Sequence, residues 1–328
     1  MCCLFPAIRA PGTRRGPLAW DGGPLNVSDP RDSNSVSEAV VDACVEAGLT
    51  RRDVNGESQE GDSWYQLTVK DGRRHSAAMA YLHPVLHLKN LQVETRALAS
   101  RVLMQDKRAV GVEFRKGGVI RTARAAREVI VAGGAINSPQ LLQLSGIGPG
   151  ALLQELGVPA IRDLAGVGEN LQDHYMIPMQ WRLKSGAISV NELTRGVRFA
   201  REVLRYAVQR RGLLTLSAAH IAAFCKSRPE LEAPDIQFHI LPASTDRERS
   251  AQAGKMVLDR KPGLTMAPCQ LRPESRGHIR IRSADPTAHP AIFANYLDDP
   301  IDQAVAVASM KRGRRIARPS CAGVAGRR

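Results

Sequence analysis

The segment Gly134–Gly148, GAINSPQLLQLSGIG, has the residue types and spacing best suited to hold a cofactor. An apolar run, Val129–Ala132, leads into Gly133-Gly134, and Ser138-Pro139 follows at a position where the start of a helix tolerates proline. Glycines let backbone amides approach a ligand closely, and the start of a helix favours an anion. The pattern therefore fits a strand, a turn and a helix that contact a dinucleotide. It also fits a tight turn in any α/β protein.

Motifs of other enzyme classes are absent from the sequence. It has no G-x-S-x-G nucleophile elbow, no P-loop and no H-E-x-x-H, so acyl transfer, phosphoryl transfer and zinc hydrolysis lack their usual groups. The six cysteines form no C-x-x-C pair and have no histidine spacing typical of zinc, so we expect reduced thiols and no metal site. They are Cys2, Cys3, Cys44, Cys225, Cys269 and Cys321.

The net charge raises the question of an anionic partner. A formal charge of +14 would favour nucleic acid or an anionic membrane, because clustered basic residues release counterions from phosphates. Much of the excess lies near the two ends of the chain, and aromatic residues make up only 4% of it, which leaves little material for base stacking. We therefore expect no nucleic-acid partner.

Length and hydropathy indicate a globular protein. The 328 residues, 43% of them hydrophobic, suffice for one large or two ordinary domains with a sizeable core. No apolar run approaches the roughly 20 residues that cross a bilayer. Met1–Pro6 lacks the basic region and the apolar stretch of a secretory signal. We expect a cytoplasmic protein with no transmembrane segment.

Periodicity organises the first half of the chain into one helix and several strands. Apolar residues at helical spacing predict a helix over Ser35–Ala47, ended by Gly48. The run Val129–Ala132 is apolar throughout, as in a strand covered on both faces. The other predicted strands are Leu91–Val93, Ala97–Met104, Ala109–Phe114 and Ile120–Ala123, with a hairpin turn at Gly117-Gly118.

The second half mixes helices and strands in an order that suggests a separate α+β domain. Apolar spacing predicts a helix over Val197–Gln209 and a strand over Asp235–Leu241. A hairpin is expected over Cys269–Arg282, with its turn at Ser275–Gly277.

Beyond these local signals, Gly134–Gly148 resembles the second signature of the glucose-methanol-choline (GMC) oxidoreductases. In that signature a small residue, Ser-Pro, two aliphatic residues and Ser-Gly-Ile-Gly occur at this spacing. The resemblance covers roughly Gly22 to Ala317. Four further segments resemble the family in the family's order: Asp53–Leu82, Asn90–Leu103, Ala165–His174 and Gln270–Pro286.

The resemblance implies an α/β plus α+β fold. It consists of a partial FAD-binding, Rossmann-like domain and a substrate domain built on an antiparallel sheet backed by helices. The implied reaction is oxidation of a small-molecule alcohol to an aldehyde or ketone, with FAD as the cofactor that takes the hydride. The sequence does not indicate which alcohol, which electron acceptor, or whether the enzyme would be a dehydrogenase or an oxidase.

The resemblance also assigns cofactor contacts to four residues. Ala99 matches a position, usually valine, whose backbone contacts the flavin adenine, and Gly133, Gly134 and Ala135 match a strand end near the nucleotide. In the segment ENLQDH, Asn170 and His174 match a loop at the domain junction. His174 could carry a proton near neutral pH, but a structural histidine bound to backbone is the favoured interpretation.

Two features of the family do not occur in the sequence. The family begins with G-x-G-x-x-G after a strand, and it ends with a segment whose histidine takes the alcohol proton. After Ile316-Ala317-Arg318 the chain instead reads PSCAGVAGRR. We therefore name no catalytic residue, and we expect a fragment, truncated at both ends and inactive by itself.

The expected domain layout follows from these matches. Residues 1–21 form a foreign or disordered leader, 22–88 a family segment of the substrate domain and flavin cover, 89–160 the partial FAD-binding domain, 161–310 the substrate domain, and 311–328 an aberrant basic tail. An alternative of another class is a non-catalytic remnant or binding module of the same fold, unable to hold flavin. The visible absorbance of bound flavin would distinguish the two.

Overall fold

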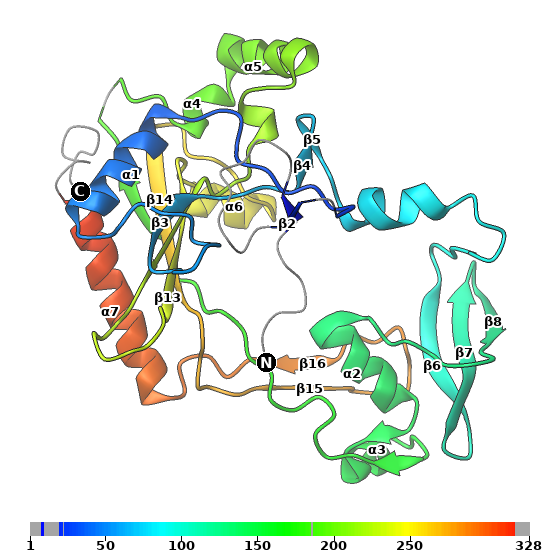
Figure 1. The fold of residues 1–328 in the computed structure, drawn as a ribbon. Helices are drawn as coiled ribbons and strands as arrows, with labels where there is room; N and C mark the ends of the chain where they lie inside the picture. Colours follow the sequence, from blue (N-terminus) through cyan, green and yellow to red (C-terminus); the bar gives the residue numbers. More distant parts are fainter. Residues whose placement is uncertain (1–7, 10–19, 22, 185, 319–328) are drawn as a thin grey trace. The chain divides into compact units, whose positions relative to one another are not determined.

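The computed structural model describes residues 8–9, 20–21, 23–184 and 186–318, and the chain divides into two units (Figure 1). Unit 1 comprises residues 1–91, 174–272 and 303–328, and unit 2 comprises residues 92–173 and 273–302. Most of the predicted leader, and the predicted tail beyond Arg318, lie outside the described residues. The predicted domain boundaries stay predictions.

An antiparallel sheet of five strands forms the centre of unit 1. Along the sheet the order is β11 (Met179–Arg182), β14 (Gly263–Gln270), β13 (Ile236–Leu241), β12 (Ile221–Cys225) and β3 (Gly61–Trp64). Side chains alternate between the two faces of a strand. On β13, Ile236, Phe238 and Ile240 enter the main core, whereas Gln237 and His239 are half-buried on the second face.

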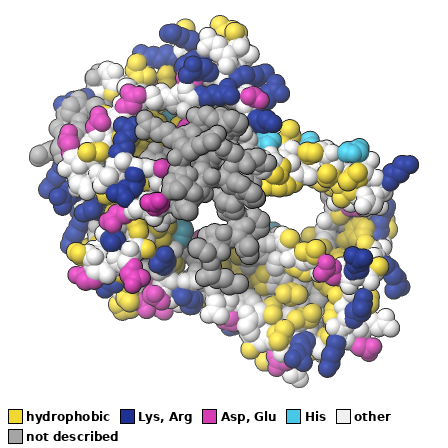
Figure 2. Space-filling view, viewed as in Figure 1, with side chains coloured by type: hydrophobic (Ala, Val, Ile, Leu, Met, Phe, Trp, Pro, Cys, Tyr) yellow, Lys and Arg dark blue, Asp and Glu magenta, His cyan; other side chains and the backbone are white. Residues whose placement is uncertain are grey.

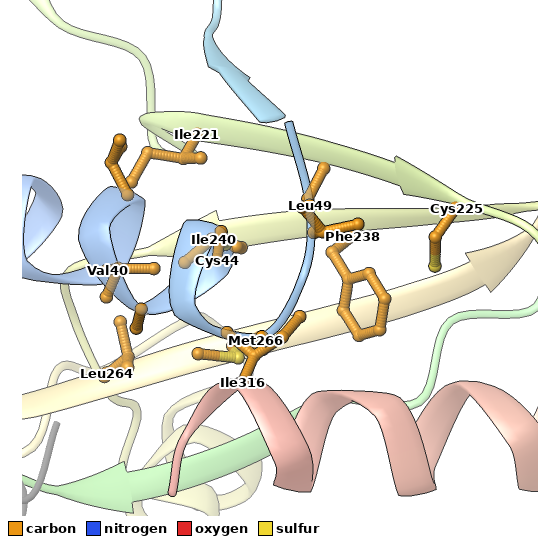
Figure 3. Packing of buried hydrophobic residues seen from close by; sticks show 14 of the residues in the cluster. Val40, Cys44, Leu49, Ile221, Cys225, Phe238, Ile240, Leu264, Met266 and Ile316 are labelled. Atoms are coloured by element: carbon orange, nitrogen blue, oxygen red, sulfur yellow. The ribbon is translucent and has the colours of Figure 1, made fainter. Parts of the chain in front are cut away.

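Two helices cover the first face of this sheet, α1 (Ser35–Glu46) and α7 (Pro300–Ile316). The side chain of Asn34 caps α1 by accepting from the Val36 amide at 2.9 Å. Val40 and Cys44, one turn apart, pack onto the sheet together with Ile316 (Figure 3). Because Ile316 is 0% exposed, the predicted basic tail contributes to the core at least as far as this residue.

Smaller elements complete the described part of unit 1. They are β1 (Ile8–Arg9) and β2 (Trp20–Asp21), β4 (Val69–Lys70) and β5 (Arg73–Arg74), a π-helical turn η1 (Ala78–Leu82), 3-10 turns η2 (His83–Val85) and η3 (Leu213–Thr215), and the helices α4 (Val190–Leu193), α5 (Gly196–Gln209) and α6 (Arg247–Ala253).

Unit 2 combines a meander of three antiparallel strands with a helix. The meander is β6 (Leu98–Gln105), β7 (Arg108–Lys116) and β8 (Val119–Arg124), and the helix is α2 (Gly134–Leu144). The remaining elements are α3 (Gly150–Glu155), the short parallel pair β9 (Ile147–Gly148) and β10 (Arg162–Asp163), and the antiparallel pair β15 (His278–Arg280) and β16 (Ala291–Phe293).

Most of the periodic segments form the predicted elements. The helices over Ser35–Ala47 and Val197–Gln209 are confirmed as α1 and α5. The strands over Ala97–Met104, Ala109–Phe114, Ile120–Ala123 and Asp235–Leu241 are confirmed as β6, β7, β8 and β13, and Gly117-Gly118 is the turn between β7 and β8. The antiparallel sheet backed by helices is confirmed as well.

Three predicted elements are wrong. Leu91–Val93 and Val129–Ala132 are not strands, and Ile130 is 79% exposed. An apolar run becomes an inner strand only where neighbours on both sides bond its amides and carbonyls, and no strand among the described residues does so here. The segment Cys269–Arg282 is not a hairpin, because β14 pairs with β13 and β11 while β15 pairs with β16.

Asp62 on β3 is a buried carboxyl beneath α1. It is 0% exposed, and neither of its carboxyl oxygens has a hydrogen-bond partner among the described residues. It pairs with Ala223, which belongs to the main core. Burial raises the pKa of Asp62 to about 6, against the charge of Arg51, and Asp42 adds to the rise. An ionised carboxylate at this place costs stability because it loses its hydration.

Replacement of Asp62 by Asn is expected to stabilise the protein at neutral pH. The folded-state pKa of about 6 lies above the ordinary value of 3.8, so the wild type loses free energy of unfolding relative to Asp62→Asn as pH rises between these values. Above them the difference stays constant, at no more than about 3 kcal/mol. Urea unfolding of both proteins across this range measures it. Asp71→Asn, at a side chain 84% exposed, serves as the control, and a difference independent of pH would contradict the assignment.

Candidate functional site

A cavity of about 710 Å³ lies within unit 2, in the size range of small-molecule sites. Four stretches of chain and one residue of β7 form its wall: the start of β6, the segment before α2, one side of α2, the loop before β16, and Val112. Most of the side chains on this wall are aliphatic. The lining residues are Ala97, Leu98, Ala99, Val112, Val129, Ile130, Val131, Ala132, Gly133, Asn137, Gln140, Leu141, Leu144, Pro286, Thr287, Ala288 and His289.

A bulge in β6 shapes the cavity wall next to Ala99. Ala99 pairs with Phe114 and Arg101 pairs with Glu113, so that Ser100 is an extra residue without a partner on β7. Such a bulge bends the strand and changes the direction of nearby side chains. Ser100 is buried, and its hydroxyl has no hydrogen-bond partner among the described residues. The bulge thus leaves one buried polar group of β6 without a partner next to Ala99 in the chain, although Ser100 itself does not line the cavity.

The start of α2 forms a second part of the wall. Gly133 is its N-cap, and no side chain caps the helix, so the amides of the first turn keep their capacity to bond a ligand. A Cβ on Gly133 would lie 3.1 Å from both the Asn137 Cβ atom and the Ser138 amide nitrogen. Gly134 has φ +77, a conformation that favours glycine. The helix dipole makes this end attractive to an anion.

The loop Pro286–His289 closes the cavity from a distant part of the chain. The side-chain amide of Gln140 donates to the Ala288 carbonyl at 3.0 Å. Asp285 accepts from the amide of Thr287 at 2.9 Å and from its hydroxyl at 2.8 Å, and these bonds lower the pKa of Asp285. Sequence reasoning missed this loop, although Gln270–Pro286 ends beside it.

Gln143 joins α2 to the rest of unit 2. It is 0% exposed, and its Nε2 donates to the carbonyls of Val167 and Ile279, both at 3.0 Å. Its Oε1 accepts from the Ile281 amide at 2.8 Å. The side-chain amide thereby satisfies three backbone groups at once, the half-buried carbonyl of Val167 and two buried groups in and just after β15.

Close backbone approaches surround Gln143. Gly168 has φ +89, and a Cβ there would lie 2.1 Å from the Ile279 carbonyl oxygen and 2.6 Å from Gln143 Nε2. At the end of α2, the Ser145 hydroxyl accepts from the Val102 amide of β6 at 2.8 Å. The C-terminal end of α2 is therefore held against the segments that line or support the cavity.

A polar cluster lies on the second face of the sheet in unit 1. The Tyr65 hydroxyl is 2.6 Å from His239 Nδ1, and Gln237 Nε2 donates to the same hydroxyl at 2.9 Å. Burial lowers the pKa of His239, with a smaller contribution from His174, and burial raises the pKa of Tyr65 to about 12. Burial thus favours the neutral form of both groups, and the tautomer of His239 decides which of them donates in their bond. Gln237 and His239 are two residues apart on β13, whereas Tyr65 directly follows β3, so no sequence spacing connects the tyrosine to the other two.

The structure brings two of the four predicted cofactor residues together. Ala99 and Gly133 line the same cavity. Gly134 and Ala135 form the first turn of α2 but do not line the cavity. Of the loop residues, Asn170 has φ +59, and His174 Nε2 is 3.2 Å from the Leu271 carbonyl oxygen, as expected for a structural histidine.

Comparison with known proteins gives one consistent family. The family model described as GMC oxidoreductase matches residues 6–176, and a second model of the same description matches residues 273–325. An alcohol dehydrogenase [acceptor] of Pseudomonas putida is 39% identical over 301 residues, which are 90% of this chain and 53% of the relative. The mitochondrial choline dehydrogenase of Homo sapiens is 38% identical over 304 residues, 92% of this chain and 50% of the relative. The chain thus spans about half the length of these curated relatives.

Solved structures with the same fold are also known. An FAD-dependent oxidoreductase from Chaetomium thermophilum has a TM-score of 0.82 at 23% identity, covering 97% of this chain and 62% of that one. Pyridoxine 4-oxidase from Mesorbium loti has a TM-score of 0.79 at 23% identity, covering 94% and 56%. At this identity the likeness concerns the fold alone.

Substitution of Gln143 by Leu is expected to destabilise unit 2 by about 2–4 kcal/mol, because it removes the partner of three backbone groups, two of them buried. Gln140→Leu, one turn earlier, removes a single bond to the Ala288 carbonyl and should cost about 1 kcal/mol. Urea unfolding compares the two variants, and amide exchange should quicken at Ile279 and Ile281 only in Gln143→Leu. Equal losses in both variants would show that Gln143 does not hold these segments together.

Proposed function

Because the chain belongs to the glucose-methanol-choline (GMC) oxidoreductase family, we propose that it serves the FAD-dependent oxidation of a small-molecule alcohol to an aldehyde or ketone. Relatives named as alcohol and choline dehydrogenases support this proposal. The observation that carries it is the cavity of unit 2, where Ala99 and Gly133, two residues of the family-like segments, lie on one wall.

The residues around the cavity fit one half of the cofactor. We assign this cavity of about 710 Å³ to the adenosine half, because Ala99 and Gly133, which match family positions near the adenine and the nucleotide, line it. Aliphatic side chains would cover the flat base, and the uncapped start of α2 suits the anionic diphosphate. When bound, FAD supplies the capacity to accept a hydride from the alcohol carbon.

The chain's own residues have positioning roles in this proposal. The backbone at Ala99 contacts the base, the amides of Gly134 and Ala135 bind phosphate oxygens, and Val129–Ala132 exclude water. On the second face of the sheet in unit 1, neutral Tyr65 and His239 are candidate contacts for the alcohol hydroxyl. We also propose a cytoplasmic location, and we assign no electron acceptor.

For this chain by itself we propose binding without turnover. Proton removal needs a base within hydrogen-bond reach of the alcohol, and none of the described residues is placed in that role by the family motifs. His174 is engaged with the Leu271 carbonyl. Choline and simple primary alcohols, tested with added FAD and an artificial electron acceptor, should give no reaction. Turnover at about 1 per second or faster would contradict this part of the proposal.

Filling the cavity should weaken nucleotide binding. Ala99→Phe places an aromatic ring where the base would lie, so we expect affinity for FAD and for ADP to fall about tenfold or more. Ala123→Phe changes an exposed alanine of β8 that does not line the cavity, and it should bind like the wild type. Equilibrium titration followed by flavin fluorescence and by calorimetry measures both. Equal affinities in the two variants, or no binding by the wild type, would refute the assignment.

A further inference from the structure

Helix α5 carries an apolar face that is turned to solvent. Val197, Leu204 and Val208 are 86%, 64% and 73% exposed, and their spacing of seven and four residues places them along one line of the helix. Phe199 and Val203, which lie further round the helix on the other side of Ala200 and Ala207, are 39% and 42% exposed. The face is continuous, because Ala200 and Ala207 fill the positions between them.

The opposite, polar face of α5 packs onto the rest of unit 1. Glu202 is the buried residue of the helix, and its carboxylate accepts from the Leu213 amide at 2.8 Å. Arg205 donates to the Asp32 carboxylate at 2.5 Å. In an ordinary surface helix the apolar residues face the core. Here polar bonds attach the helix to unit 1, and the apolar residues point away from it.

Arginines surround this apolar face. Between positions 195 and 211 the chain has six arginines and one acidic residue, Glu202. Arg198 and Arg201 are exposed on α5 itself. Figure 2 shows Lys and Arg side chains gathered with hydrophobic ones in the part of the view where Figure 1 places α5.

A shallow hollow beside the start of α5 extends the basic surface. It has a volume of about 490 Å³, and its lining residues are Arg195, Arg249, Val257, Leu258 and Arg260. Arg195 donates to the carbonyls of Leu258, Asp259 and Arg260, whereas Arg249 and Arg260 are exposed. Met256, next to the hollow in sequence, is 72% exposed. The surface thus combines exposed apolar side chains with a place that attracts phosphate.

We propose that the apolar face of α5 and the arginines beside it bind the surface of an anionic lipid bilayer. A basic amphipathic helix lies in the plane of a membrane, with its apolar face among the acyl chains and its basic residues at the headgroups. The charge complementarity favours an anionic bilayer over a second copy of this strongly basic chain, since two copies would bring like charges together.

The length of helix α5 fits attachment of the protein to one leaflet of the bilayer. Helix α5 has 14 residues, fewer than the roughly 20 that span a bilayer. None of the described helices has the length and hydropathy of a membrane span. An alcohol with an apolar tail would reach an enzyme held at such a surface from the bilayer itself, so the attachment would serve the proposed oxidation without depending on it.

Vesicle flotation tests the proposal on the full chain. Vesicles of phosphatidylcholine with phosphatidylglycerol should carry the wild type, vesicles of phosphatidylcholine alone should carry much less, and added salt should weaken binding. Leu204→Glu/Val208→Glu should reduce binding at least about tenfold. Arg198→Gln/Arg201→Gln should reduce it about thirtyfold, since each basic residue near an anionic surface contributes a factor of about five.

A matched control and a second measurement keep the test decisive. Val119→Glu/Ile120→Glu changes two residues of β8 that are 56% and 58% exposed. It adds the same two negative charges outside α5, so its binding to vesicles should stay close to that of the wild type. Circular dichroism should show that all variants fold alike. Equal binding by the two glutamate variants would overturn the proposal. So would a wild type that ignores vesicles and forms a dimer that Leu204→Glu/Val208→Glu dissociates, because α5 would then join two copies.

Discussion

The three hydrogen bonds of the buried Gln143 side chain hold unit 2 together. They connect α2 to Val167 on one side and to Ile279 and Ile281 on the other. These hydrogen bonds fix the position of the Gln143 side chain, because the loss of any one bond leaves a polar group without a hydrogen-bond partner. The glycine at 168 is a consequence, since a side chain there would collide with the same Ile279 carbonyl. This arrangement positions the last turn of α2, and with it the side of the helix that lines the cavity of unit 2.

Unit 1 uses its two sheet faces differently. One face is a largely apolar core beneath α1 and α7, which also contains the Asp62 carboxyl, the bonded pair Ser37 and His220, and the buried Nε of Arg312. The second face carries the neutral Tyr65, Gln237 and His239 cluster. Helix α5 reverses the usual arrangement, with bonds from Glu202 and Arg205 toward unit 1 and aliphatic residues outward. Polar side chains that are buried and apolar side chains that are exposed both cost stability. They are expected where a protein binds a ligand or a partner surface.

Local sequence signals predicted the elements whose stability is local. Helix α1 has its own cap and apolar stripe, and β7 and β8 have a glycine turn between them, so both could be found from spacing alone. Val129–Ala132 failed because a strand buried on both faces depends on distant partners, which no local pattern specifies. The cavity was found only in part. Ala99 and Gly133 carry motif signals, whereas Pro286–His289 reaches the site through a bond from Gln140. The orientation of α5 was also beyond the sequence, since its periodicity predicts a face but not the side on which that face lies.

Amide hydrogen exchange with and without FAD tests most directly that this cavity is the nucleotide site. If FAD binds in this cavity, its binding should slow amide exchange at Gly134, Ala135 and Ile136, at the start of α2. Exchange should also slow at Ala99–Arg101, around the bulge in β6. Strands β12 and β13 of unit 1 should exchange at unchanged rates. Protection that appears only in unit 1, or bound FAD that leaves the start of α2 and the bulge unprotected, would show that FAD does not bind in this cavity.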